Sequence, residues 1–198
     1  MGARNDTRQR MVKAGAQLLA SNGYAATGML DVVEAAGASR GSIYFHFPDG
    51  KPQLVAESLA LSTGRALERA ARAVADSAST GEAVTRTGEH LAAVLEATGY
   101  QLGCPVATVA LEVASTDAGL RDTCQDFFDR WRALYTERLL LDGVDRAAAD
   151  QLATMIISVI EGGLLLSRTA HSTAPLLDAC RAAARLLHHA TPATGDDR

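Results

Sequence analysis

The residues best suited to contact another molecule lie close together, between positions 40 and 46. An arginine can bond guanine through two parallel hydrogen bonds or pair with a phosphate group. A serine can bond a base edge or a phosphate oxygen. A glycine beside them lets the start of a helix come close to its target. These chemistries predict contact with duplex DNA through Arg40, Gly41, Ser42, Tyr44, Phe45 and His46.

The aromatic residues of this segment also suit DNA. Tyr44 and His46 are expected to bond the DNA backbone, and an exposed Phe45 is explained by contact with a thymine methyl group. Lys51 follows shortly afterwards, where its ammonium group would meet a phosphate. We add Thr27, at the start of the preceding helix, to the predicted DNA contacts.

Three short helices are needed to position these side chains. The first should end near Asn22, because Gly23 is the residue type expected just past a helix end. Thr27 or Gly28 opens a second helix, which Gly37 closes. Ser39 is expected to cap the third helix through its hydroxyl group. This third helix should run from Arg40 to Phe47 and turn Ile43 and Phe47 inward, since residues four apart share a helix face. The pattern is that of a helix-turn-helix.

The segment GYAATGMLDVVEAAGASRGSIYFHFPDGKPQL resembles the TetR family of bacterial repressors almost without gaps. Two further stretches, GAxRGSxYxHFPDGKxQL and LGCPVATVALEVAS, resemble its LmrA/YxaF subgroup, in which the loop before helix 4 is one residue longer than usual. The resemblance implies a homodimer that binds operator DNA and releases it when a small molecule enters the C-terminal domain. By analogy it suggests control of a multidrug efflux or detoxification gene.

The sequence departs from the family pattern at two positions of the head. Ala38 stands where a larger aliphatic residue is common, and Phe45 replaces a more usual polar residue or histidine. The operator sequence therefore cannot be carried over from relatives. Two other interpretations of the head are a three-helix unit whose polar face is only solvated, and a degenerate head on a protein that binds only small molecules or proteins.

Charge is distributed unevenly along the chain, whose net charge is −4. Residues 1–55 hold six basic and four acidic side chains, whereas the remaining residues hold 13 basic and 19 acidic ones. This polarity fits DNA binding at the N-terminal end. With 47% hydrophobic residues, the 198-residue chain can bury a substantial core.

Several function classes are not supported by the sequence. The motifs GxSxG, HExxH and GxxxxGKS are absent, so we expect no enzyme. The five histidines have no metal-ligand spacing, and we expect neither a metal nor a cofactor. The polar N-terminus does not resemble a signal peptide, and no apolar run was found to approach the length of a membrane span, so we expect a cytoplasmic protein.

The three cysteines, Cys104, Cys124 and Cys180, form no disulfide framework and are expected to be small buried hydrophobes. A thiol redox switch is the alternative, with Cys104 as its first candidate.

Beyond Leu54 the sequence predicts only helices, with breaks at residues 77–81, 99–103, 116–119, 142–144 and 171–175. We therefore expect an all-α protein of about nine helices, with a DNA-binding head at residues 1–50, a ligand-binding and dimerising bundle at 51–190, and a disordered tail at 191–198. A helix from Lys51 to about Ala75 would transmit motion from the bundle to the head.

Two late helices carry broad apolar faces that could form an intermolecular four-helix bundle. The alternative is that these faces pack only within the monomer. The candidate interface residues are Ile156, Val159, Ile160, Gly163, Leu176, Cys180, Ala183 and Leu187.

Aromatic residues of the 119–141 helix are candidates to line an effector pocket for a hydrophobic ligand. The candidates are Phe127, Phe128 and Trp131, although an aromatic stripe at helical spacing is also typical of a core. Glu161, within the apolar stretch ISVIEGGLLLS, could bind a ligand amine or hydroxyl group, or instead pair with an arginine or face solvent.

Overall fold

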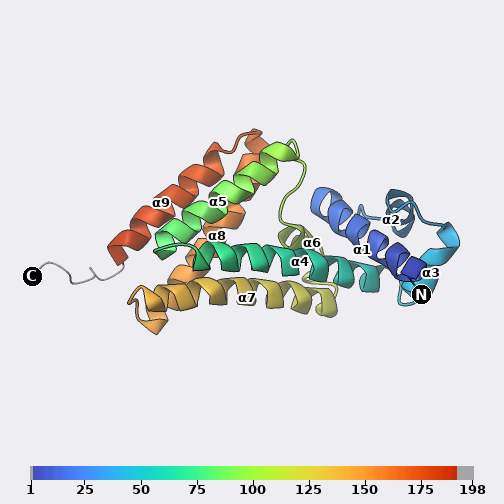
Figure 1. Cartoon of the computed structure of the whole chain (residues 1–198), viewed down its shortest axis with the longest axis horizontal. Coiled ribbons are helices and arrows are strands. Elements are labelled where there is room, and N and C mark those ends of the chain that lie inside the picture. Colours follow the sequence, from blue (N-terminus) through green and yellow to red (C-terminus); the bar gives the residue numbers. More distant parts are fainter. Residues whose placement is uncertain (1, 191–198) are drawn as a thin grey trace, which may run out of the picture. The chain divides into compact units, whose positions relative to one another are not determined.

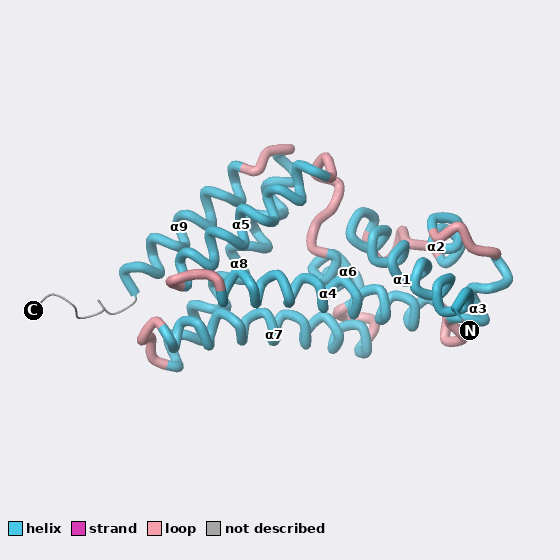
Figure 2. Tube along the Cα trace, viewed as in Figure 1, coloured by secondary structure: helices cyan, strands magenta, loops and turns pink. Residues whose placement is uncertain are grey.

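The computed structural model describes residues 2–190, and within this range it contains nine α-helices, one short 3₁₀-helix and no strand (Figures 1 and 2). The all-α fold expected from the sequence is therefore confirmed. The predicted tail at 191–198 lies outside the described residues. The elements are α1 (Gly2–Asn22), α2 (Met29–Ala35), η1 (Arg40–Ser42), α3 (Ile43–His46), α4 (Lys51–Ala75), α5 (Thr80–Ala97), α6 (Pro105–Val113), α7 (Ala118–Leu141), α8 (Arg146–Ala170) and α9 (Ala174–Ala190).

The chain divides into two compact units. The first comprises residues 1–66 and 102–127, and the second comprises residues 67–101 and 128–198. Two helices, α4 and α7, contribute residues to both units. The first unit thus combines the helix-turn-helix segment with α6, the first part of α4 and the first part of α7, so its boundary does not follow residue 50.

A small apolar core holds the head of the first unit together. Ile43 and Phe47 are fully buried, as their spacing predicted. Around them pack side chains from α1, α2 and the start of α4, namely Met11, Ala14, Val32, Val33, Ala36 and Leu54. Arg10 reinforces the packing of α1 on α2, because its Nε donates to the carbonyl oxygen of Ala36 at 3.1 Å.

The local signals for the ends of α1 and α2 are confirmed. Gly23 and Gly37 follow these helices with φ angles of +81° and +59°, in the left-handed region where a side chain is unfavourable. The prediction for Ser39 is wrong, since its side chain makes no capping hydrogen bond. Instead the hydroxyl group of Ser42 donates to the Ser39 carbonyl oxygen at 2.6 Å, and the segment begins as a 3₁₀ turn before it becomes helical.

The second unit is built on α5, α8 and α9, and α5 and α9 lie side by side in Figures 1 and 2. Gly163 of α8 is buried, and a side chain at this position would meet the Cα of Leu176 at 3.0 Å. The small residue therefore lets α8 and α9 approach closely. By length and composition α8 could cross a membrane, which the sequence interpretation overlooked. In this fold its apolar face, including Ile156 and Ile160, is buried within the chain.

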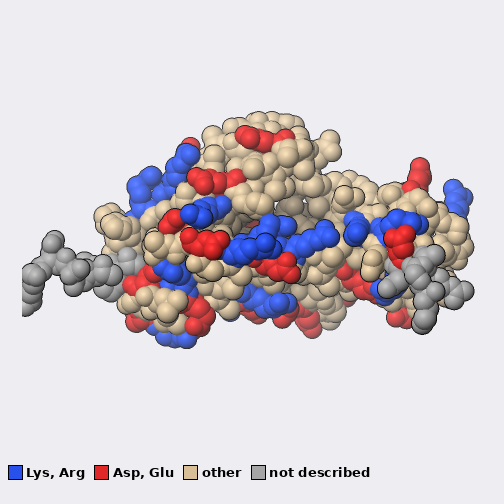
Figure 3. Space-filling model, viewed as in Figure 1, with Lys and Arg blue, Asp and Glu red and all other residues tan. Residues whose placement is uncertain are grey.

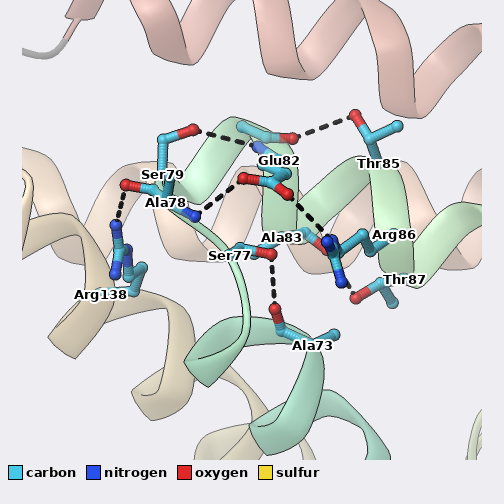
Figure 4. Close-up of polar contacts among 11 residues, drawn as sticks. Ala73, Ser77, Ala78, Ser79, Glu82, Ala83, Thr85, Arg86, Thr87 and Arg138 are labelled. Carbon is cyan, nitrogen blue, oxygen red and sulfur yellow. Dashed lines mark hydrogen bonds and ion pairs between the residues drawn. The ribbon is translucent and has the colours of Figure 1, made fainter.

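The turn between α4 and α5 is fixed by polar contacts (Figure 4). Ser79 caps α5, because its side chain accepts a hydrogen bond from the amide of Glu82. Glu82 reaches back to the amide of Ala78 at 2.8 Å, and this bond, together with Arg86, lowers the pKa of its carboxyl group. Arg138 of α7 donates to the Ala78 carbonyl oxygen. The side chains of Ser79 and Glu82 thus provide acceptors for the amides of Glu82 and Ala78 at the start of α5.

Candidate nucleic-acid interface

The predicted recognition segment presents two large aromatic side chains to solvent. Tyr44 is 65% exposed and Phe45 is 66% exposed, although both follow directly on the fully buried Ile43. Arg40 and Gly41 are also exposed, whereas Ser42 and His46 are half-buried. The segment therefore brings six of the eight predicted DNA contacts together on one short element.

The side chain of Thr27 does not belong to this surface. It is only 2% exposed, and its hydroxyl group donates to the carbonyl oxygen of Gly23 at 2.7 Å. The prediction that the Thr27 side chain contacts DNA is therefore corrected. Its hydroxyl group closes the turn after α1 and has no access to a phosphate. The sequence prediction recognised a helix start but not this intrachain bond.

Lys51 begins α4 and is half-buried, with its ammonium group directed to the turn after α1. The Nζ atom lies 3.4 Å from the carbonyl oxygen of Ala25 and 4.4 Å from the centre of the Tyr24 ring. This cation–π contact holds the lysine against the turn after α1. Burial raises the pKa of Tyr24, with a further contribution from the negative charge of Asp117.

Sequence reasoning missed two residues of this region, Tyr24 and Glu112. The carboxylate of Glu112, on α6, accepts hydrogen bonds from the amides of Tyr24 and Ala25. No local pattern marks Glu112, because its partners lie 88 and 87 positions away in the sequence. The glycine at position 23 was the only signal of an unusual backbone there.

Charged side chains of both signs lie next to one another on the face drawn in Figure 3. In the head, Arg8 pairs with Glu57 at 2.6 Å and Arg10 pairs with Asp6 at 2.8 Å. Part of the basic charge counted in the sequence is thus neutralised within the chain. Arg40 and Lys51, two of the predicted DNA contacts, take part in neither of these ion pairs.

Family models match both parts of the sequence. Residues 11–58 match the model of bacterial regulatory proteins of the tetR family, and residues 80–182 match the C-terminal domain of LmrA/YxaF-like transcriptional regulators. The chain belongs to the TetR family. Its subgroup resemblance is confirmed as well, and the protein is a DNA-binding transcriptional regulator, not an enzyme.

Individual relatives of this TetR-family chain match over nearly their whole length. The transcriptional regulator LmrA of Bacillus subtilis is 32% identical over 87% of this chain and 92% of its own. YxaF of the same organism, an uncharacterised regulator, is 34% identical over 89% of this chain and 93% of its own. A TetR regulator from Chloroflexus aurantiacus, of known crystal structure, is 28% identical, with a TM-score of 0.80 over 95% of this chain and 97% of its own.

The predicted effector residues of this TetR-family member lie mostly in the interior. Phe127 and Trp131 are only 4% and 6% exposed, and Phe128 and Glu161 are half-buried. Nearby, Tyr135 is fully buried, and its hydroxyl group lies 2.9 Å from that of Thr87. Interior positions are compatible with a packed core and with a cavity wall, so the effector assignment stays a prediction.

The predicted dimer residues turn out to pack within the chain. Seven of the eight are buried in the monomer, and Val159 is half-buried. The apolar faces chosen from the sequence therefore join α8 and α9 to the same bundle, which was the alternative interpretation. The residues buried within the monomer are Ile156, Ile160, Gly163, Leu176, Cys180, Ala183 and Leu187. Their assignment to a dimer interface stays a prediction.

Two of the three cysteines are buried. Burial raises the pKa of Cys180 to about 11 and also raises the pKa of Cys124, so both are protonated thiols at neutral pH. Cys104 is half-buried at the start of α6. In residues 2–190 no group of three or more His, Cys, Asp or Glu side chains is placed to hold a metal ion. A cleft of about 360 Å³ in the second unit has none of the predicted effector residues in its lining.

Proposed function

We propose that this TetR-family regulator is a homodimeric repressor that binds a near-palindromic operator through the segment at residues 40–46. The observation that carries the proposal is the pair of exposed aromatic side chains, Tyr44 and Phe45, beside Arg40 on a short element with a buried inner face. One such element reads few bases. Two copies related by a two-fold axis would read half-sites about one helical turn apart.

The structural relatives support the DNA partner at the level of the fold. A mutant of the TetR-family regulator CifR, 18% identical with a TM-score of 0.75, has been crystallised with a 26-base-pair operator duplex. The test is selection of bound fragments from a random duplex library, with sequencing of the recovered DNA. We expect a two-fold symmetric site. No enrichment by the folded protein would favour the degenerate head instead.

We propose that the dimer forms through exposed leucines on the outer faces of α8 and α9. Leu165 and Leu166 on α8 are 61% and 58% exposed, and Leu186 on α9 is 61% exposed. Burying these leucines against a second copy would stabilise a dimer through the hydrophobic effect. We expect Leu165→Glu to convert the dimer to a monomer in light-scattering measurements. Leu141→Glu is the matched control, since Leu141 is 81% exposed at the end of α7. A dimeric Leu165→Glu variant would disprove this surface.

We propose the division of labour expected from the sequence, with residues 1–50 binding DNA and residues 51–190 binding effector and dimerising. A small hydrophobic effector would favour a conformation in which the two heads no longer match the operator spacing. A ligand with equal affinity for both conformations would shift nothing. The test is a screen of flat aromatic compounds for release of the selected duplex. A compound that saturates the protein without changing DNA affinity would contradict this mechanism.

The cellular role that we propose is control of an efflux or detoxification gene in the cytoplasm of a bacterium. It rests on the similarity to LmrA and YxaF and on the apolar interior around Trp131. The selected operator sequence, searched against the genome, should lie upstream of such a gene.

A further inference from the structure

A single carboxylate of α6 holds the backbone of the turn between α1 and α2. The Oε1 atom of Glu112 accepts the amide hydrogen of Tyr24 at 2.9 Å, and its Oε2 atom accepts that of Ala25 at 2.6 Å. All three residues belong to the first compact unit. Hydrogen bonds to an ionised acceptor are the stronger kind, and two of them in parallel also fix direction. Each carboxylate oxygen therefore holds one of two successive amides.

The position before these amides is shaped to admit the carboxylate. A side chain at Gly23 would collide with the carboxylate of Glu112 and would lie 3.2 Å from the Cγ2 of Thr108. Gly23 itself has a φ angle of +81°, in the left-handed region that favours glycine. A second hydrogen bond joins α1 to the loop before α6, since the amide of Gly103 donates to the Ala20 carbonyl oxygen at 3.3 Å. The absence of a side chain at Gly23 therefore leaves room for the Glu112 carboxylate beside the amides that it binds.

The opposite side of the turn faces a predicted DNA contact. Lys51 lies 3.4 Å from the carbonyl oxygen of Ala25, whose amide is bound by Glu112. The turn is therefore held between a carboxylate on its amide side and an ammonium group on its carbonyl side. Releasing the amides would loosen the turn against which the Lys51 ammonium group lies.

We propose that Glu112 is a positioning residue for DNA binding, which holds the 23–27 turn and through it the ammonium group of Lys51 in the geometry that meets a phosphate. This inference rests on the proposed function of the head. It assigns a role in DNA binding to α6, which lies in the region matched by the C-terminal family model at residues 80–182. Glu112 itself touches no base.

The test compares Glu112→Gln with wild-type protein. Glutamine keeps the length of the side chain, but its amide nitrogen would oppose one of the two backbone N–H groups, so only one bond can form. We expect affinity for the fluorescein-labelled duplex selected by the wild-type protein to fall about tenfold, with the base preference unchanged. We also expect faster hydrogen exchange at the amides of Tyr24 and Ala25.

Two controls separate positioning from general stability. Leu111→Ala alters the neighbouring exposed residue of α6, and Glu89→Gln removes an exposed carboxylate from α5. Both should bind and unfold like the wild type. Wild-type affinity in Glu112→Gln, or unchanged exchange at Tyr24 and Ala25, would overturn the proposal. If the wild type selects no DNA, the proposed function fails, and the exchange measurement, which needs no DNA, still decides whether Glu112 holds the turn.

Discussion

The aromatic residues of the head and of α7 have opposite environments. Tyr44 and Phe45 are about two-thirds exposed, whereas Trp131 and Tyr135 are almost completely buried. The first pair lies on a short element, next to a buried isoleucine, and the second pair lies one helical turn apart within a long helix. Exposed aromatic side chains contribute little to the core, which is consistent with the contact to DNA that we propose for Tyr44 and Phe45. The buried pair stabilises the fold.

This difference predicts a large loss of stability from truncation in α7. Trp131→Ala should lower the free energy of unfolding by about 3–5 kcal/mol, because it removes buried surface and leaves a cavity. Phe45→Ala should change it by less than about 0.5 kcal/mol but weaken DNA binding. Urea unfolding measures the first quantity. If Trp131→Ala proved no more destabilising than Phe45→Ala, Trp131 would line an open effector pocket.

Arg40 tests whether the exposed segment reads bases. Arg40→Ala should reduce discrimination at one position of the half-site by about 1–3 kcal/mol, the amount that a bidentate contact to guanine contributes. Stability should be unchanged, because the residue is exposed. Repeating the fragment selection with the variant measures the effect. Unaltered affinity and preference would show that the groove assignment of this segment is wrong.

A substitution of Lys51 tests the predicted contact to the phosphate backbone, which does not depend on the base sequence. Lys51→Ala should weaken binding to all duplexes alike and lower the slope of log affinity against log salt by about 0.9, the value for one phosphate contact. Binding titrations between 50 and about 200 mM salt measure this slope. A change of sequence preference, with the slope intact, would place Lys51 against a base edge.

The same contrast explains how far the sequence could be interpreted. The ends of α1 and α2 depend on neighbouring residues such as Gly23 and Gly37, and these were predicted correctly. The contacts of Glu112 depend on how the chain folds back, and they were not predicted. The bond of the Thr27 hydroxyl group to the Gly23 carbonyl oxygen is local, and it was missed as well. For α8 and α9 the apolar periodicity was recognised, but periodicity cannot distinguish a partner helix of the same chain from that of a second chain. The close contact at Gly163 shows that α8 and α9 of one chain pack together, and the dimer assignment stays a prediction.

Tyr135 provides the smallest and most selective test of the buried region. Its hydroxyl group lies 2.9 Å from that of Thr87, so Tyr135→Phe should cost about 1 kcal/mol at neutral pH. Burial raises the pKa of Tyr135 to about 12, against 10.0 for an exposed tyrosine. The folded state therefore keeps a proton that the unfolded state releases. This contribution to stability is fully present below pH 10 and is lost as the pH rises through 12.

Phenylalanine has no proton to lose. Therefore only the wild type loses free energy of unfolding at this position as the pH rises above 10. One pH unit above 10 removes about 1.4 kcal/mol from the wild type, which slightly exceeds the hydrogen bond gained. The stability curves of wild type and Tyr135→Phe should therefore cross close to pH 11. Cys180 and the arginines are shared by both proteins and cancel in the difference. Urea unfolding of both proteins at pH 8, 10 and 11 measures the crossing. Parallel curves would mean that water reaches the phenol, as expected for the wall of an open pocket.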